Sequence, residues 1–278
     1  MMTRRRARFW PRSGAADRSM KPFVRGLIGL LLTLSANGCA TLDRTDVRLA
    51  SAKTAGIVSA IGDDFTFTRA GLAAPTEAEQ HFPIQTWGLD DLVAIRVGLL
   101  LGKRYQVQGL TYSRAPFAAQ DAVSPFAISN AISKLTKSSE DRLIELVRTQ
   151  IAPQGLDLYV VVTKAVAPFG SRSRTVAGIG VIERLAVLGS SGQLHALYTI
   201  TVIDGHTFKV IGKRQAGPLE GDELFRLKGP CREVGADMLS AAGAPASSDE
   251  LKAAAIELID RGLPKTLRDL LLIDQPKS

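Results

Sequence analysis

A nearly continuous apolar run, Leu156-Asp-Leu-Tyr-Val-Val-Val-Thr163, limits the folds open to this chain more than any other segment. Valine and tyrosine favour extended backbone, and a strand with one wet face would alternate apolar with polar residues. A run that is apolar at almost every position instead predicts a central strand covered on both faces, after a helix that stops at Gly155. The chain therefore needs layers of structure on both sides of a sheet.

Other segments can supply the rest of that sheet. Short apolar or alternating runs predict further strands at 55–60, 65–68, 105–112, 175–183, 194–203 and 207–213. The turn residues Gly62-Asp63-Asp64 predict that the first two strands form a hairpin. Asp204-Gly205-His206-Thr207 predicts a second hairpin between the last two.

Helical patterns lie between these strands. Helices are expected at 89–101, from 124, from 138 and at 249–272. The first is apolar on nearly every side, which predicts a buried helix, with Asp90 and Asp91 in its first turn. Ser138 and Asp141 form a capping box, and Gly262-Leu263-Pro264 predicts a break in the last helix. The order of elements indicates the α/β class, a mixed sheet with hairpins and helices packed on it, in one domain over residues 53–278.

The amino-terminal segment has the three zones of a secretory signal peptide. Lys21 and Arg25 carry positive charge, residues 27–34 are almost wholly apolar, and small or polar residues lead to Gly38-Cys39. The apolar run is about half of the ~20 residues needed to span a bilayer, which argues against a permanent transmembrane helix. We predict a signal peptide over residues 1–38, in which Met20 offers a second start site.

Gly38-Cys39 resembles the lipobox of bacterial lipoprotein precursors, although Ala36 and Asn37 stand where that family usually has leucine and a small residue. The resemblance covers residues 20–42. It implies that the Cys39 thiol carries a diacylglyceryl group, that the signal is cut before it, and that residues 39–52 form a lipidated tether. Ala40 would then imply the periplasmic face of the outer membrane of a Gram-negative bacterium. The alternative is an ordinary signal peptide beside an incidental Cys39.

The charge balance changes once the signal is set aside. The chain has 35 basic and 27 acidic residues, a net charge of +8, but residues 1–38 hold eight of the basic residues and only one acid. The remainder is close to neutral, so no basic footprint for nucleic acid is expected. Cys231 has no second cysteine to pair with if Cys39 is lipidated, and we interpret it as a small buried residue rather than a nucleophile.

Several side chains are candidates for chemical sites. Asp63 and Asp64 could serve a metal or acid–base chemistry, yet a turn explains them. Histidines and an aspartate that could converge on zinc lack the spacing of a zinc site; they are His81, His195, Asp204 and His206. Gly178-Ile179-Gly180 lacks the third glycine of a dinucleotide fingerprint, and the basic segment 170–174 is interpreted as a solvated loop. We predict no catalytic residue, no metal and no cofactor.

The predicted hairpin at residues 196–212 loosely resembles one in periplasmic α/β domains of outer-membrane lipoproteins, such as those of curli secretion and of penicillin-binding-protein activation. In those domains an Asp-x-x-Thr turn joins two strands, as Asp204 and Thr207 do here. The resemblance favours a lipid-anchored, non-catalytic binding or assembly module of the cell envelope, with the membrane and an envelope protein or peptidoglycan as partners. The alternative is an envelope hydrolase, metal-dependent or not, built from Asp63, Asp64 and His206.

Overall fold

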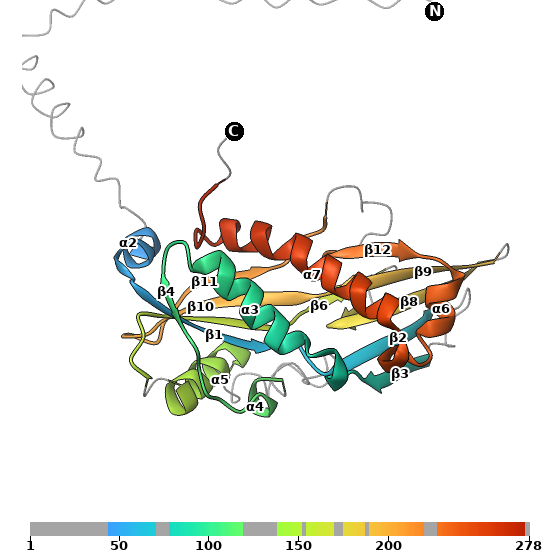
Figure 1. The fold of residues 1–278 in the computed structure, drawn as a ribbon, viewed down its shortest axis with the longest axis horizontal. Helices are drawn as coiled ribbons and strands as arrows, with labels where there is room; N and C mark the ends of the chain where they lie inside the picture. The colour runs from blue at the N-terminus through green and yellow to red at the C-terminus, as the bar shows by residue number, and fades with distance from the viewer. Residues whose placement is uncertain are drawn as a thin grey trace, which may run out of the picture. The chain divides into compact units, whose positions relative to one another are not determined.

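The computed structural model describes residues 44–70, 78–118, 138–151, 154–169, 175–186, 189–219 and 227–275. Residues Asp43–Ser278 form one compact unit. This unit contains two mixed sheets with helices packed on them (Figure 1). The predicted α/β class is confirmed.

The first sheet has the strand order β11-β10-β5-β1-β4. Its members are β1 (Thr54–Ala60), β4 (Gln106–Gln108), β5 (Leu158–Lys164), β10 (Tyr198–Asp204) and β11 (Val210–Gln215). β1 runs parallel to β4 and β5, whereas β10 runs antiparallel to β5 and β11. The hairpin predicted at Asp204 is therefore confirmed as β10–β11.

The second sheet has the order β12-β9-β8-β2-β3. Its members are β2 (Asp64–Ala70), β3 (Ala78–Pro83), β8 (Ile179–Ala186), β9 (Gly189–Ala196) and β12 (Cys231–Val234). Only the β2–β8 pair is parallel. A small separate pair joins β6 (Val166–Pro168) to β7 (Thr175–Ala177).

The two sheets meet where three chain segments exchange backbone hydrogen bonds in a closed cycle. The Ala165 N–H donates to the Leu197 carbonyl (3.1 Å), the Leu197 N–H to the Gly178 carbonyl (2.8 Å), and the Gly178 N–H to the Ala165 carbonyl (3.0 Å). Gly178 adopts φ 58°, a left-handed conformation that suits glycine. The strands predicted at 175–183 and 194–203 are consequently each divided in two, at Gly178 and Leu197.

Helices lie on both sides of the first sheet. They are α2 (Arg44–Ser51), α3 (Leu89–Leu101), α4 (Ala115–Ala118), α5 (Ser139–Leu146) with its π-helical extension η4 (Val147–Ile151), α6 (Ala236–Ala241) and α7 (Asp249–Asp269), with single 3₁₀ turns η2 (Gln85–Trp87) and η7 (Pro245–Ser247). α3 and α7 cover one face, and α4 and α5 cover the other (Figure 1). Among the described residues, no helix is both long and apolar enough to span a bilayer.

β5 has the doubly covered position that its sequence predicts. Leu158, Val160 and Val162 join the core beneath α3 and α7, whereas Tyr159 and Val161 join the core beneath α4 and α5. All five are at most 1% exposed. Each large apolar side chain buried in this way contributes about 1.5–3 kcal/mol, so β5 stabilises both layers at once.

The hairpin predicted across Gly62-Asp63-Asp64 is wrong. β1 already has β4 on one side and β5 on the other, so no edge is left for β2. The chain turns at Gly62, with φ 111°, and enters the second sheet, where β2 pairs with β3 and β8. The strand predicted at 105–112 is also shorter, because the Tyr112 hydroxyl takes over the edge of β1 and bonds the Ser59 N–H (2.9 Å) and carbonyl (3.2 Å).

The helix predictions hold in position but not in every detail. The Ser138–Asp141 capping box is confirmed, and a helix starting at 124 lies outside the described residues. α3 has the predicted bounds, yet it is not fully buried, since two of its apolar residues face solvent. α7 continues through Pro264 because buried Leu263 and Leu267 prolong its apolar stripe.

The predicted tether is helical from Arg44 onward. α2 packs on the domain through Leu49, which is 2% exposed and belongs to the main core. The Tyr105 hydroxyl also donates to the Leu49 carbonyl (3.4 Å). The ordered domain thus begins at least nine residues before the predicted boundary at residue 53, because one buried leucine outweighs the polar character of its neighbours.

The first turn of α3 is fixed by a buried carboxylate rather than by the helix dipole alone. Asp90 is 3% exposed and its Oδ1 accepts from the Ser59 hydroxyl (3.0 Å) and the Ile61 N–H (2.8 Å). Burial raises the pKa of Asp90, against the lowering effect of these two hydrogen bonds. The side chain therefore joins α3 to the end of β1.

We expect Asp90→Ala to lower the free energy of unfolding by about 2–4 kcal/mol, because two donors lose their buried acceptor. The neighbouring Asp91→Ala is the matched control: it removes only an exposed ion pair with Arg114 and should cost less than about 1 kcal/mol. Urea unfolding of the two variants checks this difference, and equal losses would contradict the role assigned to Asp90.

Candidate functional site

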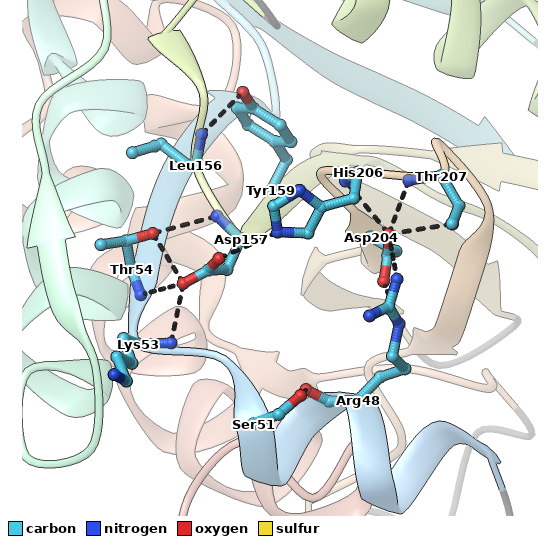
Figure 2. A network of polar contacts seen from close by, with 10 residues as sticks. All are labelled: Arg48, Ser51, Lys53, Thr54, Leu156, Asp157, Tyr159, Asp204, His206 and Thr207. Carbon is cyan, nitrogen blue, oxygen red and sulfur yellow. Dashed lines mark hydrogen bonds and ion pairs between the residues drawn. The ribbon is translucent and has the colours of Figure 1, made fainter.

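A network of polar side chains closes the end of the first sheet where β1 and β5 begin and the β10–β11 turn lies (Figure 2). We call it the amino-end cluster. Its members are Arg48, Lys53, Thr54, Asp157, Asp204, His206 and Thr207. Two carboxylates organise it, one at the start of β5 and one at the end of β10.

Asp157 binds the start of β1. Its Oδ2 accepts from the backbone N–H groups of Lys53 and Thr54 (both 2.9 Å) and from the Thr54 hydroxyl (3.0 Å). Its Oδ1 lies 3.0 Å from Nε2 of His206. The two backbone donors are the main reason why the pKa of Asp157 lies well below its ordinary value, and burial opposes them only partly.

Asp204 holds both the hairpin turn and α2. Its Oδ1 accepts from the Thr207 N–H (2.7 Å), the Thr207 hydroxyl (2.9 Å) and the His206 N–H (3.1 Å). Its Oδ2 forms an ion pair with Nε of Arg48 (2.7 Å). Burial disfavours the charge on Asp204, but the Thr207 hydrogen bonds and Arg48 outweigh it, and the pKa is lowered. The Asp-x-x-Thr pattern therefore marks a turn that is held by hydrogen bonds from Thr207 to Asp204.

The hydroxyl groups of this end of the sheet are already engaged. Thr54 donates to Asp157, Thr207 donates to Asp204, and Ser51 donates to the Arg48 carbonyl (3.1 Å). None of these three hydroxyls donates to His206. The His206–Asp157 contact joins the turn to the start of β5.

A groove opens beside the amino-end cluster, between α2 and β11. Its volume is about 470 Å³, and its lining includes Val47, Val210 and Ile211 together with Arg48 and Lys209. Val47 is 51% exposed. Asp204 also lines the groove and is paired with Arg48, so the groove combines an apolar wall with an internal ion pair and the exposed Lys209.

The structure separates the residues predicted for the alternative hydrolase site. His206 lies at the amino end of β1, beside Asp157, whereas Asp63 and Asp64 follow its carboxyl end, about 20 Å away along the strand. Asp64 Oδ2 instead lies 2.8 Å from Nδ1 of His81 on the neighbouring strand β3. The three residues are therefore not brought together.

The remaining candidates are held by the second sheet. His195 is fully buried and its Nδ1 lies 3.0 Å from the Gly178 carbonyl; burial lowers its pKa to about 4. Cys231 is buried as predicted, and its sulfur accepts from the Gln193 amide (3.2 Å). Within the described ranges, no three histidine, cysteine or acidic side chains gather as a metal site would require. Residues 170–174 lie outside those ranges.

Sequence reasoning missed Asp157 and Arg48. Asp157 carried a usable signal, since it is the one charged residue inside the apolar run 156–163. Burying a carboxylate at the start of a central strand costs free energy unless hydrogen-bond donors surround it. Arg48 gave no comparable signal, because its partner lies 156 positions away.

No protein-family model and no curated protein matches the chain. Similar solved structures include the PelC dodecamer from Paraburkholderia phytofirmans, at 11% identity, covering 81% of this chain and 91% of that one, with a TM-score of 0.28. Protein CT253 from Chlamydia trachomatis has 10% identity, coverages of 80% and 94%, and a TM-score of 0.30. Lipoprotein GNA1162 from Neisseria meningitidis has 10% identity, coverages of 77% and 99%, and a TM-score of 0.25. Similarity this low assigns no residue role here.

We expect Arg48→Met to loosen α2, because the variant keeps the apolar stem and removes the ion pair with Asp204. The loss should be about 1–2 kcal/mol, and amide hydrogen exchange should accelerate in residues 44–51 before it does in the sheets. Arg214→Met, which removes an exposed pair with Asp269, is the matched control. Unchanged protection of α2 in Arg48→Met would show that Leu49 alone holds the helix.

His195 should make the fold sensitive to acid in a defined window. The unfolded chain binds a proton near the ordinary pKa of 6.5, whereas folded His195 resists protonation until about pH 4. The free energy of unfolding should therefore fall by about 3 kcal/mol as the pH falls from 6.5 to about 4, and this effect should be absent above pH 6.5.

We expect His195→Gln, which keeps a donor for the Gly178 carbonyl, to reduce the pH dependence of the free energy of unfolding between about pH 4 and pH 6.5. Urea titrations at several pH values provide the measurement, and parallel curves for wild type and His195→Gln would contradict the assignment.

Proposed function

We propose that this chain is a lipid-anchored, non-catalytic binding or assembly module of the bacterial cell envelope, attached through Cys39. The observation that carries the proposal is the position of α2. This helix begins five residues after Cys39 and is locked to the amino-end cluster by Arg48. The lipobox-like Gly38-Cys39 pair supplies the chemistry of attachment.

The short spacing sets the orientation that we propose. Five residues reach at most about 17 Å, so a lipid on Cys39 would hold α2 and the adjoining groove close to the bilayer. Lys53 and Lys209 are exposed at this end, and neither has an ion-pair partner among the described residues. Basic side chains near an anionic membrane surface contribute about 1 kcal/mol each, which would add to the lipid anchor.

The contacts of the amino-end cluster favour binding over catalysis. Asp157 and Asp204 are saturated with donors from the protein itself, so they serve to hold α2 and the turn in place. A hydrolase built from Asp63, Asp64 and His206 would need residues that lie at opposite ends of β1. We therefore retain the binding module, with an envelope protein or peptidoglycan as partner and the periplasmic face of the outer membrane as location.

We expect Cys39→Ser to leave an uncleaved precursor without lipid, because only a thiol forms the thioether that lipoprotein processing requires. Mass spectrometry of the wild-type amino-terminal peptide should show acylated Cys39, and the variant should migrate as a larger species. Cys231→Ser is the matched control, since that thiol is buried in the second sheet, and it should be processed normally.

Three results would contradict the proposal. An unmodified Cys39 in the wild type, or identical cleavage of Cys39→Ser, would reduce the chain to an ordinary secreted protein. Turnover of phosphate or carboxylate esters by the purified chain, abolished by His206→Ala, would instead indicate the hydrolase.

A further inference from the structure

α3 presents an apolar ridge to solvent. Its inward residues Val93 and Val97 are fully buried in the main core, but Ile95 and Leu99 are 62% and 65% exposed. Single exposed apolar residues are common on protein surfaces, whereas two large ones a helical turn apart form a patch. The chain forms this ridge far in sequence from Cys39, so its role is independent of the lipid anchor.

A groove runs along each side of the ridge. Between α3 and β4 the groove measures about 320 Å³, and Gly98, Val107 and Leu110 contribute to its lining. Between α3 and α7 it measures about 280 Å³, lined in part by Leu263 and Pro264. A ridge flanked by two apolar grooves can receive a similar ridge, because packed helices interlock ridges with grooves.

The residues along the ridge are self-complementary when reversed. Asp91, Ile95 and Leu99 lie on α3, and Lys103 follows in the turn after its last residue; the four stand at intervals of four, and all are exposed. In the opposite chain direction, the order is one basic residue, two apolar residues and one acidic residue. Two copies aligned antiparallel about a twofold axis would place Ile95 against Leu99 and Asp91 against Lys103 at both ends.

These features identify the occupant. We propose that the α3 ridge binds the α3 ridge of a second copy of this chain in an antiparallel, twofold-symmetric dimer. Asp91 contacts Arg114 in its own chain but its side chain remains 67% exposed, and Lys103 has no ion-pair partner among the described residues. A parallel arrangement would bring like charges together, whereas the antiparallel one gives each Lys103 a carboxylate.

The test uses the full chain in a mild detergent, with mass measured by sedimentation equilibrium over a concentration series. The wild type should dimerise, and Leu99→Lys should raise the dissociation constant about tenfold or more, since it places a charge in the apolar contact. Asp91→Lys and Lys103→Asp should each weaken the dimer, and the double swap should restore it. Circular dichroism and thermal unfolding confirm that each variant is folded.

Three results would overturn the proposal: a monomeric wild type, a dimer indifferent to Leu99→Lys, or single charge swaps that weaken a dimer which the double swap fails to restore. Recovery of a different protein on this ridge, with the chain otherwise monomeric, would overturn it as well. None of these results depends on whether Cys39 is lipidated, so failure here and failure of the proposed anchor are distinguishable.

Discussion

The cycle of backbone hydrogen bonds among Ala165, Gly178 and Leu197 allows one chain to build two sheets over a shared core. Strands that leave one sheet for another would otherwise bury unpaired N–H and carbonyl groups at the crossing, at a cost of about 1–3 kcal/mol each. Here each of the three segments donates to one neighbour and accepts from the other. α7 can consequently cover strands of both sheets with one continuous apolar stripe.

The sequence predicted the elements better than their partners. The run 156–163 identified a doubly buried strand, and the apolar run 89–101 identified α3 to the residue. Strand pairing was harder to predict. The sequence of β1 indicates half of a hairpin with β2, whereas β4 and β5 occupy both of its edges. Local turn chemistry at Gly62 is compatible with either outcome, and only the distant strands β4 and β5 decide between them.

The candidate site shows the same difference between local contacts, which the sequence predicts, and long-range contacts, which it does not. The turn from Asp204 to Thr207 was predictable because its hydrogen bonds are local. The contacts that make it part of a site come from Arg48 and Asp157, which reach it across long sequence distances. Hydrophobic patterning also failed to predict which residues are buried. Leu49 is buried and fixes α2 although its segment is polar, whereas Ile95 and Leu99 are exposed although their segment is apolar. Composition alone does not reveal which face meets a core.

The parallel pairing of β1 has a kinetic consequence. Thr54 and Asp157, which join the starts of β1 and β5, lie 103 positions apart, and Arg69 of β2 lies 114 positions from its partner Glu183 in β8. Loop closure over such distances must precede the contacts that reward it, so we expect slow folding with high relative contact order. A chain that crosses a membrane amino terminus first would leave one edge of β1 unpaired until β5 had followed, and one edge of β2 unpaired until β8 had followed. In the export proposed above, that delay would expose unpaired strand edges to other chains during transit, when aggregation competes with folding.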